Sequence, residues 1–270
     1  QVAQRSNKPD YLIIVNEKLA GGEMLKLADQ AGIKTLVAFN SFEGEQTAEF
    51  GAPRQKYRHW LGSLTPNAVD AGSLTATELV RQAAKMRTVA DDGKIHVAVI
   101  AGDKATPTGT QRLQGAVDAL SANPAVTLEQ VVFGNWDRAR AKEQAAALLL
   151  RYPKLNAFWM ASDLMAYGAM EAAEAAGRKP GTDLLFSAVN NSPEVLQARI
   201  QGRISALAGG HFTAGAWSLV MLYDYHHGKD FKNEGLELRE PLFVLLDAET
   251  AQRFLHRFGN EDFSAVDFRQ

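Results

Sequence analysis

The stretch Tyr11-Leu-Ile-Ile-Val15, followed by a helical segment and then by Thr35-Leu-Val-Ala-Phe39, decides the fold. Continuous apolar runs of this length are typical of strands that are buried on both faces, as in a parallel sheet covered by helices. The same pattern recurs four more times along the chain, at His96-Val-Ala-Val-Ile100, Gln130-Val-Val-Phe133, Ala157-Phe-Trp-Met160 and Leu184-Leu-Phe-Ser-Ala-Val189. This alternation predicts an α/β fold built from right-handed βαβ units.

Chain length and the number of βα units favour two lobes. The chain has 270 residues, and a single domain holds about 100–150 residues. We therefore predict two doubly wound parallel sheets. A closed (β/α)8 barrel shows the same alternation and is the main alternative.

Composition excludes several classes of protein. The hydrophobic content of 46% and the charged content of 22% are ordinary for a soluble globular protein. A net charge of −2 without a basic block argues against nucleic-acid binding. The chain has no cysteine, which removes disulfides, thiol nucleophiles and cysteine-ligated zinc and fits a periplasmic protein. No secretion signal is visible, but a mature chain would already have lost one.

Neutral polar residues follow several of the predicted strands. Parallel sheets bind ligands outside the carboxyl ends of their strands. An amide both donates and accepts hydrogen bonds, so these residues suit a polyhydroxylated ligand better than a phosphate or a metal. The alternative is that the asparagines only form turns. The residues are Asn16, Asn40 with Ser41, Ser162, and Asn190 with Asn191, and the acidic Asp163 directly follows Ser162.

Two larger side chains are further candidates. Arg112 lies near the start of a predicted helix, and its planar guanidinium suits two adjacent sugar hydroxyls. Trp136 lies in the turn before a helix, where its indole could stack on the apolar face of a sugar ring. The alternatives are a surface arginine paired with a carboxylate and a tryptophan that fills the core. We expect Trp60, Trp159 and Trp217 to be core or shell residues.

Four segments, in this order, resemble the type I periplasmic sugar-binding proteins, the group of ribose- and galactose-binding proteins that has quorum-signal receptors among its relatives. The order and spacing hold over nearly the whole chain. The segments are Lys8-Pro9-Asp10-Tyr11-Leu-Ile-Ile-Val-Asn16, Ala101-Gly-Asp103 followed by Gln111-Arg112-Leu-Gln-Gly115, Gly134-Asn-Trp136-Asp137-Arg138, and Ala161-Ser-Asp163-Leu-Met-Ala-Tyr-Gly168-Ala.

The resemblance implies two lobes joined by a three-segment hinge, with the ligand between them. The N-terminal lobe would comprise 1–65 plus 210–243, and the C-terminal lobe 66–209 plus 244–270. The hinge segments would lie near Thr65–Asn67, Ala208–Gly210 and Leu242–Leu246. The family's first strand and helix normally come before the equivalent of Gln1, so we expect the first β-α unit to be absent from this chain.

The resemblance also implies a set of ligand-binding residues. Asn190 stands where many relatives have Asp, Ser162 replaces a frequent Asn, and Gly209 stands where relatives often carry a polar contact. His211 could reach the ligand or support the helix that follows it, and Asp163 or Ser162 is expected to cap the helix that begins after them. The predicted ligand-binding residues are Asn16, Asn40, Ser41, Arg112, Trp136, Ser162, Asn190, Gly209 and His211, with Phe42 as a weaker candidate.

These observations predict a periplasmic, monomeric, non-enzymatic protein that closes on a sugar or polyol and delivers it to the membrane permease of an ABC importer. A receptor that signals to a sensor kinase or chemoreceptor, and the effector domain of a LacI-type transcription regulator, remain alternatives. No G-x-G-x-x-G follows a strand and no P-loop or nucleophile–base pair is present, so we predict no cofactor and no enzyme. His226 and His227 are adjacent and would point in different directions on a helix, so we predict no metal site.

Overall fold

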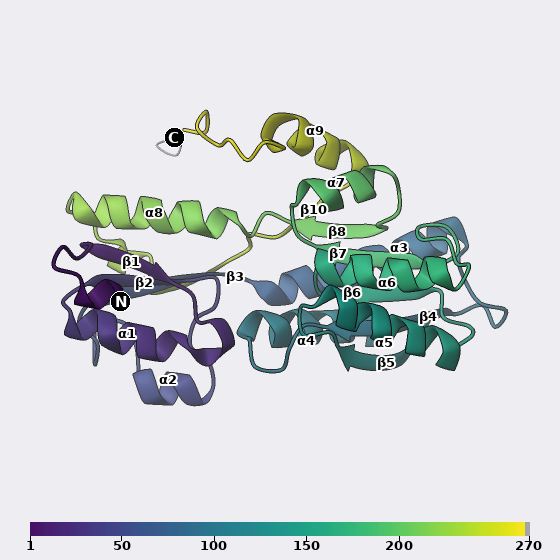
Figure 1. The fold of residues 1–270 in the computed structure, drawn as a ribbon, viewed down its shortest axis with the longest axis horizontal. Helices are drawn as coiled ribbons and strands as arrows, with labels where there is room; N and C mark the ends of the chain where they lie inside the picture. The colour runs from purple at the N-terminus through teal and green to yellow at the C-terminus, as the bar shows by residue number, and fades with distance from the viewer. Residues whose placement is uncertain (268–270) are drawn as a thin grey trace. The chain divides into compact units, whose positions relative to one another are not determined.

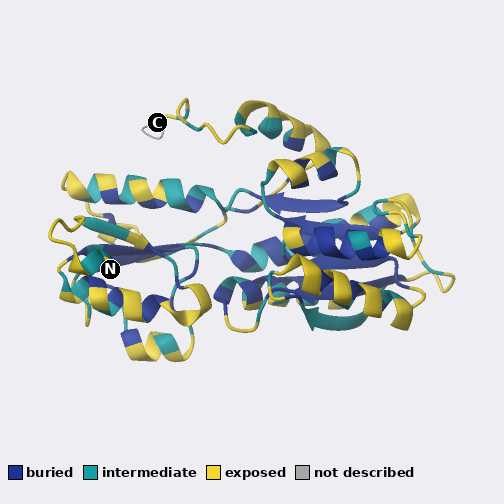
Figure 2. Ribbon diagram, in the orientation of Figure 1, coloured by how far each residue is buried: buried dark blue, intermediate teal, exposed yellow. Residues whose placement is uncertain are grey.

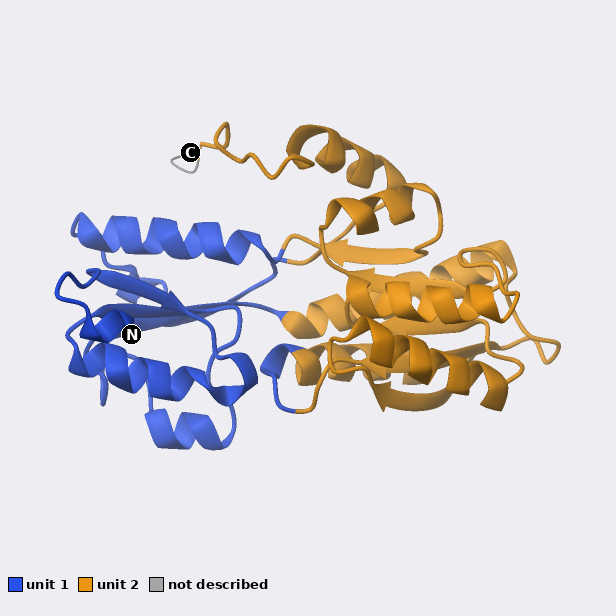
Figure 3. Cartoon of the chain, viewed as in Figure 1, with its two compact units in different colours: residues 1–67, 105–108, 211–242 blue, residues 68–104, 109–210, 243–270 orange. Residues whose placement is uncertain are grey.

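The computed structural model describes residues 1–267, which form two compact units (Figure 3). Unit 1 comprises Gln1–Asn67, Ala105–Thr108 and His211–Leu242, and unit 2 comprises Ala68–Lys104, Gly109–Gly210 and Phe243–Gln270. The chain passes between the units after Asn67, Lys104, Thr108, Gly210 and Leu242. The segment Ala105–Thr108, which the predicted boundaries place in the C-terminal lobe, groups instead with unit 1.

Unit 1 contains a parallel sheet with the strand order β1-β2-β3-β9. The strands are β1 (Tyr11–Ile14), β2 (Lys34–Ala38), β3 (Trp60–Pro66) and β9 (Glu237–Glu240). The sequence analysis missed β9, because Glu-Leu-Arg-Glu has little apolar character and lies at the edge of the sheet, where charged residues are common.

Helices cover both faces of this sheet. Figure 1 shows α8 (Thr213–His226) on one face, with α1 (Gly21–Gln30) and α2 (Glu45–Phe50) on the other. Neighbouring side chains of β2 point to opposite faces, so Leu36 packs with Leu222 of α8 while Val37 packs with Leu25 of α1. Only Phe50 of the six residues of α2 is buried, so the apolar periodicity of this segment is too weak to indicate a helix from the sequence.

Unit 2 contains a six-stranded sheet with the order β10-β8-β7-β6-β4-β5. All neighbouring strands are parallel except β10, which is antiparallel to β8. Two open sheets confirm the predicted α/β fold and exclude a single closed barrel for the described residues. The strands are β4 (Ile95–Ala101), β5 (Val126–Phe133), β6 (Ala157–Met160), β7 (Leu185–Val189), β8 (Ala206–Gly209) and β10 (Val244–Leu245).

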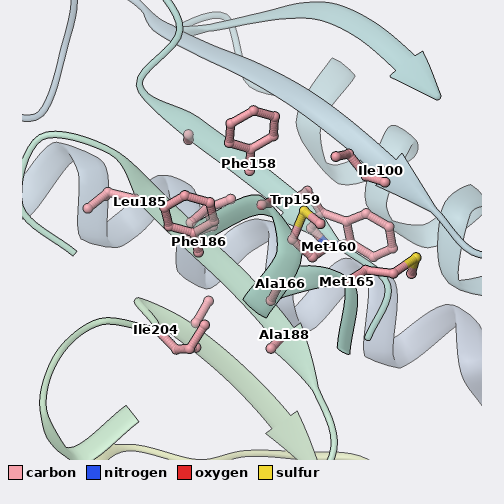
Figure 4. Close-up of a cluster of buried hydrophobic side chains, with 14 of the residues drawn as sticks. Ile100, Phe158, Trp159, Met160, Met165, Ala166, Leu185, Phe186, Ala188 and Ile204 are labelled. Carbon is pink, nitrogen blue, oxygen red and sulfur yellow. The ribbon is translucent and has the colours of Figure 1, made fainter. Parts of the chain in front are cut away.

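The core of unit 2 lies between this sheet and its helices. Figure 2 shows the central strands as buried, and Figure 4 shows buried side chains of β6 and β7. Phe158 stacks on Phe186 with ring centres 5.6 Å apart, whereas Trp159 points to the other face of the sheet and donates a hydrogen bond to Thr75 of α3. Burying one such side chain stabilises the fold by about 1.5–3 kcal/mol. Helix α3 packs against β6, β7 and β8, while α5 and α6 pack on each other. The helices are α3 (Ala68–Met86), α4 (Pro107–Ser121), α5 (Arg138–Arg151), α6 (Asp163–Ala175), α7 (Pro193–Ile200) and α9 (Ala248–Phe258).

Short polar side chains begin several of these helices. Asp137 accepts a hydrogen bond from the backbone N–H of Arg140 at the start of α5. Ser162, Ser192 and Asp247 cap α6, α7 and α9 in the same way. Each cap satisfies an N–H that has no partner within its own helix. Among the described residues, no helix combines the length and the apolar character that a membrane crossing requires.

His96 on β4 is buried between two carboxylates. Its Nδ1 lies 2.5 Å from Glu129 Oε1 and its Nε2 lies 2.9 Å from Asp92 Oδ2. Both ring nitrogens therefore face acceptors, which favours the imidazolium form. Burial lowers the pKa of His96, but the hydrogen bonds to Glu129 and Asp92 outweigh it, so the pKa is raised above its ordinary value.

Candidate functional site

The strand order of unit 2 reverses between β4 and β6. From β4 the chain moves outward to β5 on one side, and from β6 it moves outward through β7 and β8 on the other. In open α/β sheets, ligands bind beyond the carboxyl ends of the strands at such a reversal. The segments that begin at Gly102 and Ala161 follow these two strands, so they define the place where the candidate residues of unit 2 should meet.

Arg112 reaches this point from the first turns of α4. Its Nη1 donates a hydrogen bond of 2.8 Å to the carbonyl oxygen of Ala161, directly after β6. The guanidinium carbon lies 5.9 Å from the ring centre of Trp136 and 5.4 Å from that of Phe243. Aromatic faces attract a cation, so the two rings hold the guanidinium in position.

The position of Arg112 depends on two glycines, because α3 and α4 approach each other closely. A Cβ on Gly72 of α3 would lie 2.0 Å from the carbonyl oxygen of Arg112, and a Cβ on Gly115 of α4 would lie 2.1 Å from that of Val69. Real Cβ atoms do not approach oxygen this closely. The two glycines therefore fix the distance of α4 from α3, and with it the reach of Arg112.

Arg112 is a buried cation with spare hydrogen-bonding capacity. The residue is only 6% exposed, and its Nε is buried without a hydrogen-bond partner among the described residues. Burial lowers the pKa of Arg112 to about 10, and the charge of Asp163 offsets only part of this effect. A surface arginine paired with a carboxylate, the alternative weighed from the sequence, does not describe this residue.

Trp136 lies beside Arg112 in a turn that glycines make possible. The indole packs over Gly102, where a Cβ would lie 2.1 Å from Cζ2 of the ring. Its Nε1 donates a hydrogen bond of 2.6 Å to Asp103 Oδ2. The ring is partly buried and packs against the core of unit 2. The hydrogen bond to Asp103 and the close contact with Gly102 together fix the orientation of the indole.

Of Asp163 and Ser162, the two predicted caps of α6, only Ser162 caps the helix, and Asp163 has a different role. Ser162 is the helix cap, through a hydrogen bond from the N–H of Met165. The Asp163 side chain is buried and accepts hydrogen bonds from Asn190 Nδ2 at 3.1 Å and from Ser192 Oγ at 2.8 Å. Asp163 therefore ties the end of β7 to the start of α6, a role that its neighbours in the sequence do not reveal.

Asn190 and Gly209 are held by the same part of unit 2. The Asn190 Oδ1 accepts a hydrogen bond of 2.8 Å from the N–H of Asn191. Asn191 in turn accepts one of 2.7 Å from the N–H of Gly210, and its amide occupies the space that a Cβ on Gly209 would need. Gly209 thus makes room for Asn191. Asn191 is one of the polar residues that follow a predicted strand, but it is not among the predicted ligand-binding residues.

Asn16 in unit 1 has its amide engaged by protein groups. Its Nδ2 donates to the carbonyl oxygen of Ser41 at 2.9 Å and to Gln46 Oε1 at 2.7 Å, and its Oδ1 accepts from the N–H of Gly21. Both N–H groups are therefore used, and Asn16 is fully buried. In this structure Asn16 organises the loops after β1 and β2, so a contact with ligand stays a prediction.

Asn40 and Ser41 lie after β2. Asn40 Oδ1 accepts hydrogen bonds from the N–H and the hydroxyl of Thr108, at 2.9 and 2.6 Å. The Ser41 Oγ is buried and has no hydrogen-bond partner among the described residues. Phe42 packs against Phe50 and Trp60 in the core, so it is not a candidate for ligand contact.

Left-handed backbone marks the strand ends of both candidate regions. Phe39, just after β2, has a φ of 63°, and Asn135 and Trp136, just after β5, have φ values of 54° and 62°. Lys18 and Leu19, after β1, are also left-handed, at 47° and 63°. Such conformations cost about 1–3 kcal/mol each and gather at functional sites.

The remaining predicted positions have mixed outcomes. His211 belongs to unit 1, immediately before α8, where its carbonyl accepts the N–H of Ala214. Trp60 and Trp159 are fully buried, as predicted, but Trp217 is 43% exposed and is not a core residue. His226 ends α8. The described residues contain no cluster of His, Cys, Asp and Glu able to hold a metal ion.

The chain belongs to the family described as "Periplasmic binding protein domain", whose sequence model matches residues 2–230. This result confirms the resemblance drawn from the four sequence segments. The chain is 30% identical over 129 residues to the D-allose-binding periplasmic protein of Escherichia coli strain K12, a match that covers 47% of this chain. It is 35% identical over 82 residues, 30% of this chain, to the D-ribose/D-allose-binding protein of Pseudomonas aeruginosa. These matches cover 41% and 25% of the two relatives, so the chain spans less than half of each.

Solved structures agree with this assignment. A periplasmic sugar-binding protein from Pseudomonas fluorescens is 40% identical, with a TM-score of 0.86, over 99% of this chain and 77% of that one. A galactofuranose binding protein shares the fold, with a TM-score of 0.76 and 20% identity over 96% of this chain and 81% of that one.

Proposed function

We propose that this chain is a non-enzymatic, periplasmic solute-binding protein for a sugar or sugar-like polyol. The observation that carries the proposal is the buried guanidinium of Arg112, held beside Trp136 at the strand-order reversal with an unsatisfied Nε. A buried N–H without a partner gains a hydrogen bond when a ligand hydroxyl or carboxylate binds beside it. The names of the similar sugar-binding, allose-binding and ribose-binding proteins support the same class of ligand.

The ligand is proposed to contact residues of both units. On unit 2 these are Arg112, Trp136, Ser162, Asn190 and Gly209, and on unit 1 Asn16, Asn40, Ser41 and His211. A ligand that contacts both units favours a closed state because it binds that state better than the open one. Small-angle X-ray scattering tests this step: the radius of gyration should fall when saturating ligand is added. An unchanged radius with proven binding would reject closure.

Binding itself is tested by a thermal-shift screen followed by calorimetry. The panel contains D-allose, D-ribose, D-galactose, L-arabinose, myo-inositol and the corresponding sugar acids. A ligand that binds only the folded chain stabilises it by about 2.7 kcal/mol at a concentration of 100 Kd, which raises the melting temperature. If no member raises it, the proposed ligand class is wrong.

Arg112→Ala should weaken binding of the best ligand by more than about tenfold, since a hydrogen bond to a charged group contributes about 1.5–3 kcal/mol. Arg253→Ala on α9 is the matched control, because that arginine is exposed and outside the proposed site. Equal affinities of the two variants would remove Arg112 from the site.

The membrane partner is proposed to be the permease of an ABC importer. Cells that lack this chain should lose uptake of the labelled ligand and recover it when the chain is restored. Normal uptake without the chain would favour a receptor role instead.

A further inference from the structure

The proposed binding region of unit 2, around Arg112 and Trp136, holds a positive charge that has no carboxylate as a direct partner among the described residues. Arg112 forms no ion pair with any carboxylate of the described residues, and its one hydrogen bond goes to the Ala161 carbonyl. Its aromatic neighbours, Trp136 and Phe243, carry no net charge. Placing a cation out of water without an anionic partner is unfavourable.

Asp163 is the acidic group whose charge acts on Arg112, but its oxygens are already occupied. They accept hydrogen bonds from Asn190 Nδ2, from Ser192 Oγ and from the N–H of Leu164. These bonds hold the carboxylate in place at the start of α6. Its charge attracts Arg112 without satisfying the guanidinium.

Asn190 adds no negative charge either. Its Nδ2 is bound to Asp163 and its Oδ1 accepts from the N–H of Asn191. A carboxylate at position 190 would lie about as close to Asp163 as the present amide nitrogen, at 3.1 Å, and would be repelled. In this chain the neutral side chain of Asn190 completes the network, and no carboxylate of the described residues forms an ion pair with Arg112.

The guanidinium of Arg112 has one donor that is engaged and one that has no partner. Nη1 donates to the Ala161 carbonyl oxygen, whereas Nε, which shares the other edge of the group with Nη2, is buried and forms no hydrogen bond with the described residues. Two parallel N–H donors on one edge match the two oxygens of a carboxylate. A neutral sugar can use the same donors, but it leaves the charge unbalanced.

We infer that the preferred ligand is a sugar acid, an aldonate or uronate, whose carboxylate binds the Nε–Nη2 edge of Arg112 while its ring or chain packs beside Trp136. This inference rests on the proposed function and names the substrate class of that same site. A charge-assisted hydrogen bond is roughly twice as strong as a neutral one, so the acid should bind at least about tenfold tighter than the matching neutral sugar.

The test uses matched pairs that differ only in the acid group: D-galacturonate with D-galactose, D-glucuronate with D-glucose, and D-ribonate with D-ribose. Dissociation constants are measured by calorimetry on the full chain at pH 7.5, with sodium acetate as a control anion. We expect at least one acid to bind tenfold or more tighter than its neutral partner, with no binding of acetate at the same concentration.

Two variants separate charge from shape. Arg112→Gln removes the charge and should bring the two affinities of a pair within about threefold. Arg112→Lys keeps the charge and should retain the preference for the acid, with weaker binding because the planar fork is lost. Circular dichroism checks that each variant is folded.

The possible outcomes lead to different conclusions. Equal or tighter binding of every neutral partner would overturn the inference and leave the proposed sugar-binding function intact. An equal effect of acetate would show a simple anion contact and would also overturn it. If neither acids nor neutral sugars bind, the proposed function itself fails.

Discussion

Gly102→Ala tests whether the close contact between Gly102 and Trp136 positions the indole. The new Cβ would lie 2.1 Å from Cζ2 of Trp136, whereas ordinary contacts begin at 3.4 Å, so the ring must move by about 1.3 Å. A shift of this size breaks the hydrogen bond of 2.6 Å from Nε1 to Asp103 Oδ2. A hydrogen bond to a charged group contributes about 1.5–3 kcal/mol, and partial exposure of Trp136 places the loss near the lower value.

The expected result is a fall in melting temperature of about 3–6 °C, since about 1.5 kcal/mol shifts the midpoint of a unit of this size by 2–4 °C per kcal/mol. Ligand affinity should fall by about 2–10-fold, because an aromatic contact contributes about 0.5–1.5 kcal/mol. Differential scanning fluorimetry and calorimetry measure the two effects.

Gly215→Ala is the matched control. It lies within α8, where a Cβ would be 3.9 Å from Phe39 Cζ, an ordinary contact. Alanine favours a helix over glycine by about 1 kcal/mol, so the melting temperature should stay or rise and affinity should not change. If Gly102→Ala behaves like this control in both assays, the proposed role of Gly102 in positioning Trp136 is refuted.

Three further predictions concern other parts of unit 2. Gly72→Ala should push α4 away from α3, because the new Cβ would lie 2.0 Å from the Arg112 carbonyl oxygen. We expect a loss of stability of about 1–3 kcal/mol together with weaker ligand binding. Unchanged binding would refute the role of this contact in placing Arg112. The raised pKa of His96 means that its stabilising contribution is complete below its unfolded pKa of about 6.5 and is lost as the pH rises through the folded pKa. Urea denaturation between pH 5.5 and 9 measures this loss, and a His96→Asn variant with the same pH slope as the parent would contradict the assignment. Asp137→Ala removes the cap of α5 and should cost about 1 kcal/mol in the same assay, with an effect below 0.3 kcal/mol counting against the cap.

The strands of this protein were predictable where they are buried by helices. β6 is apolar along its whole length, and so is β4 apart from His96, because both faces of the unit 2 sheet are covered, and that pattern is local in the sequence. β9 was not predictable, because its formation depends on pairing with β3, far away in the chain, and its own side chains are charged. Helix α2 was missed for a similar reason, since one buried phenylalanine holds it.

The sequence also identified Arg112 and Trp136 as candidate residues, because their chemistry and their place after strands are local properties. It did not reveal what surrounds them. The Ala161 carbonyl that Arg112 binds is 49 residues away, Phe243 comes from the last part of the chain, and the glycines that admit Trp136 and α4 matter only through the atoms that approach them.

The charge state of this region was decided by the tertiary structure alone. Composition counts Asp163 and Asn190 as one acid and one amide, but only the folded structure shows that the oxygens of the acid already accept hydrogen bonds from this amide and from Ser192. Periodicity and residue type depend on neighbours in the chain, and they determine the elements and the donors. The environment of a buried charge depends on atoms that folding brings together, so it is set only when the chain has folded.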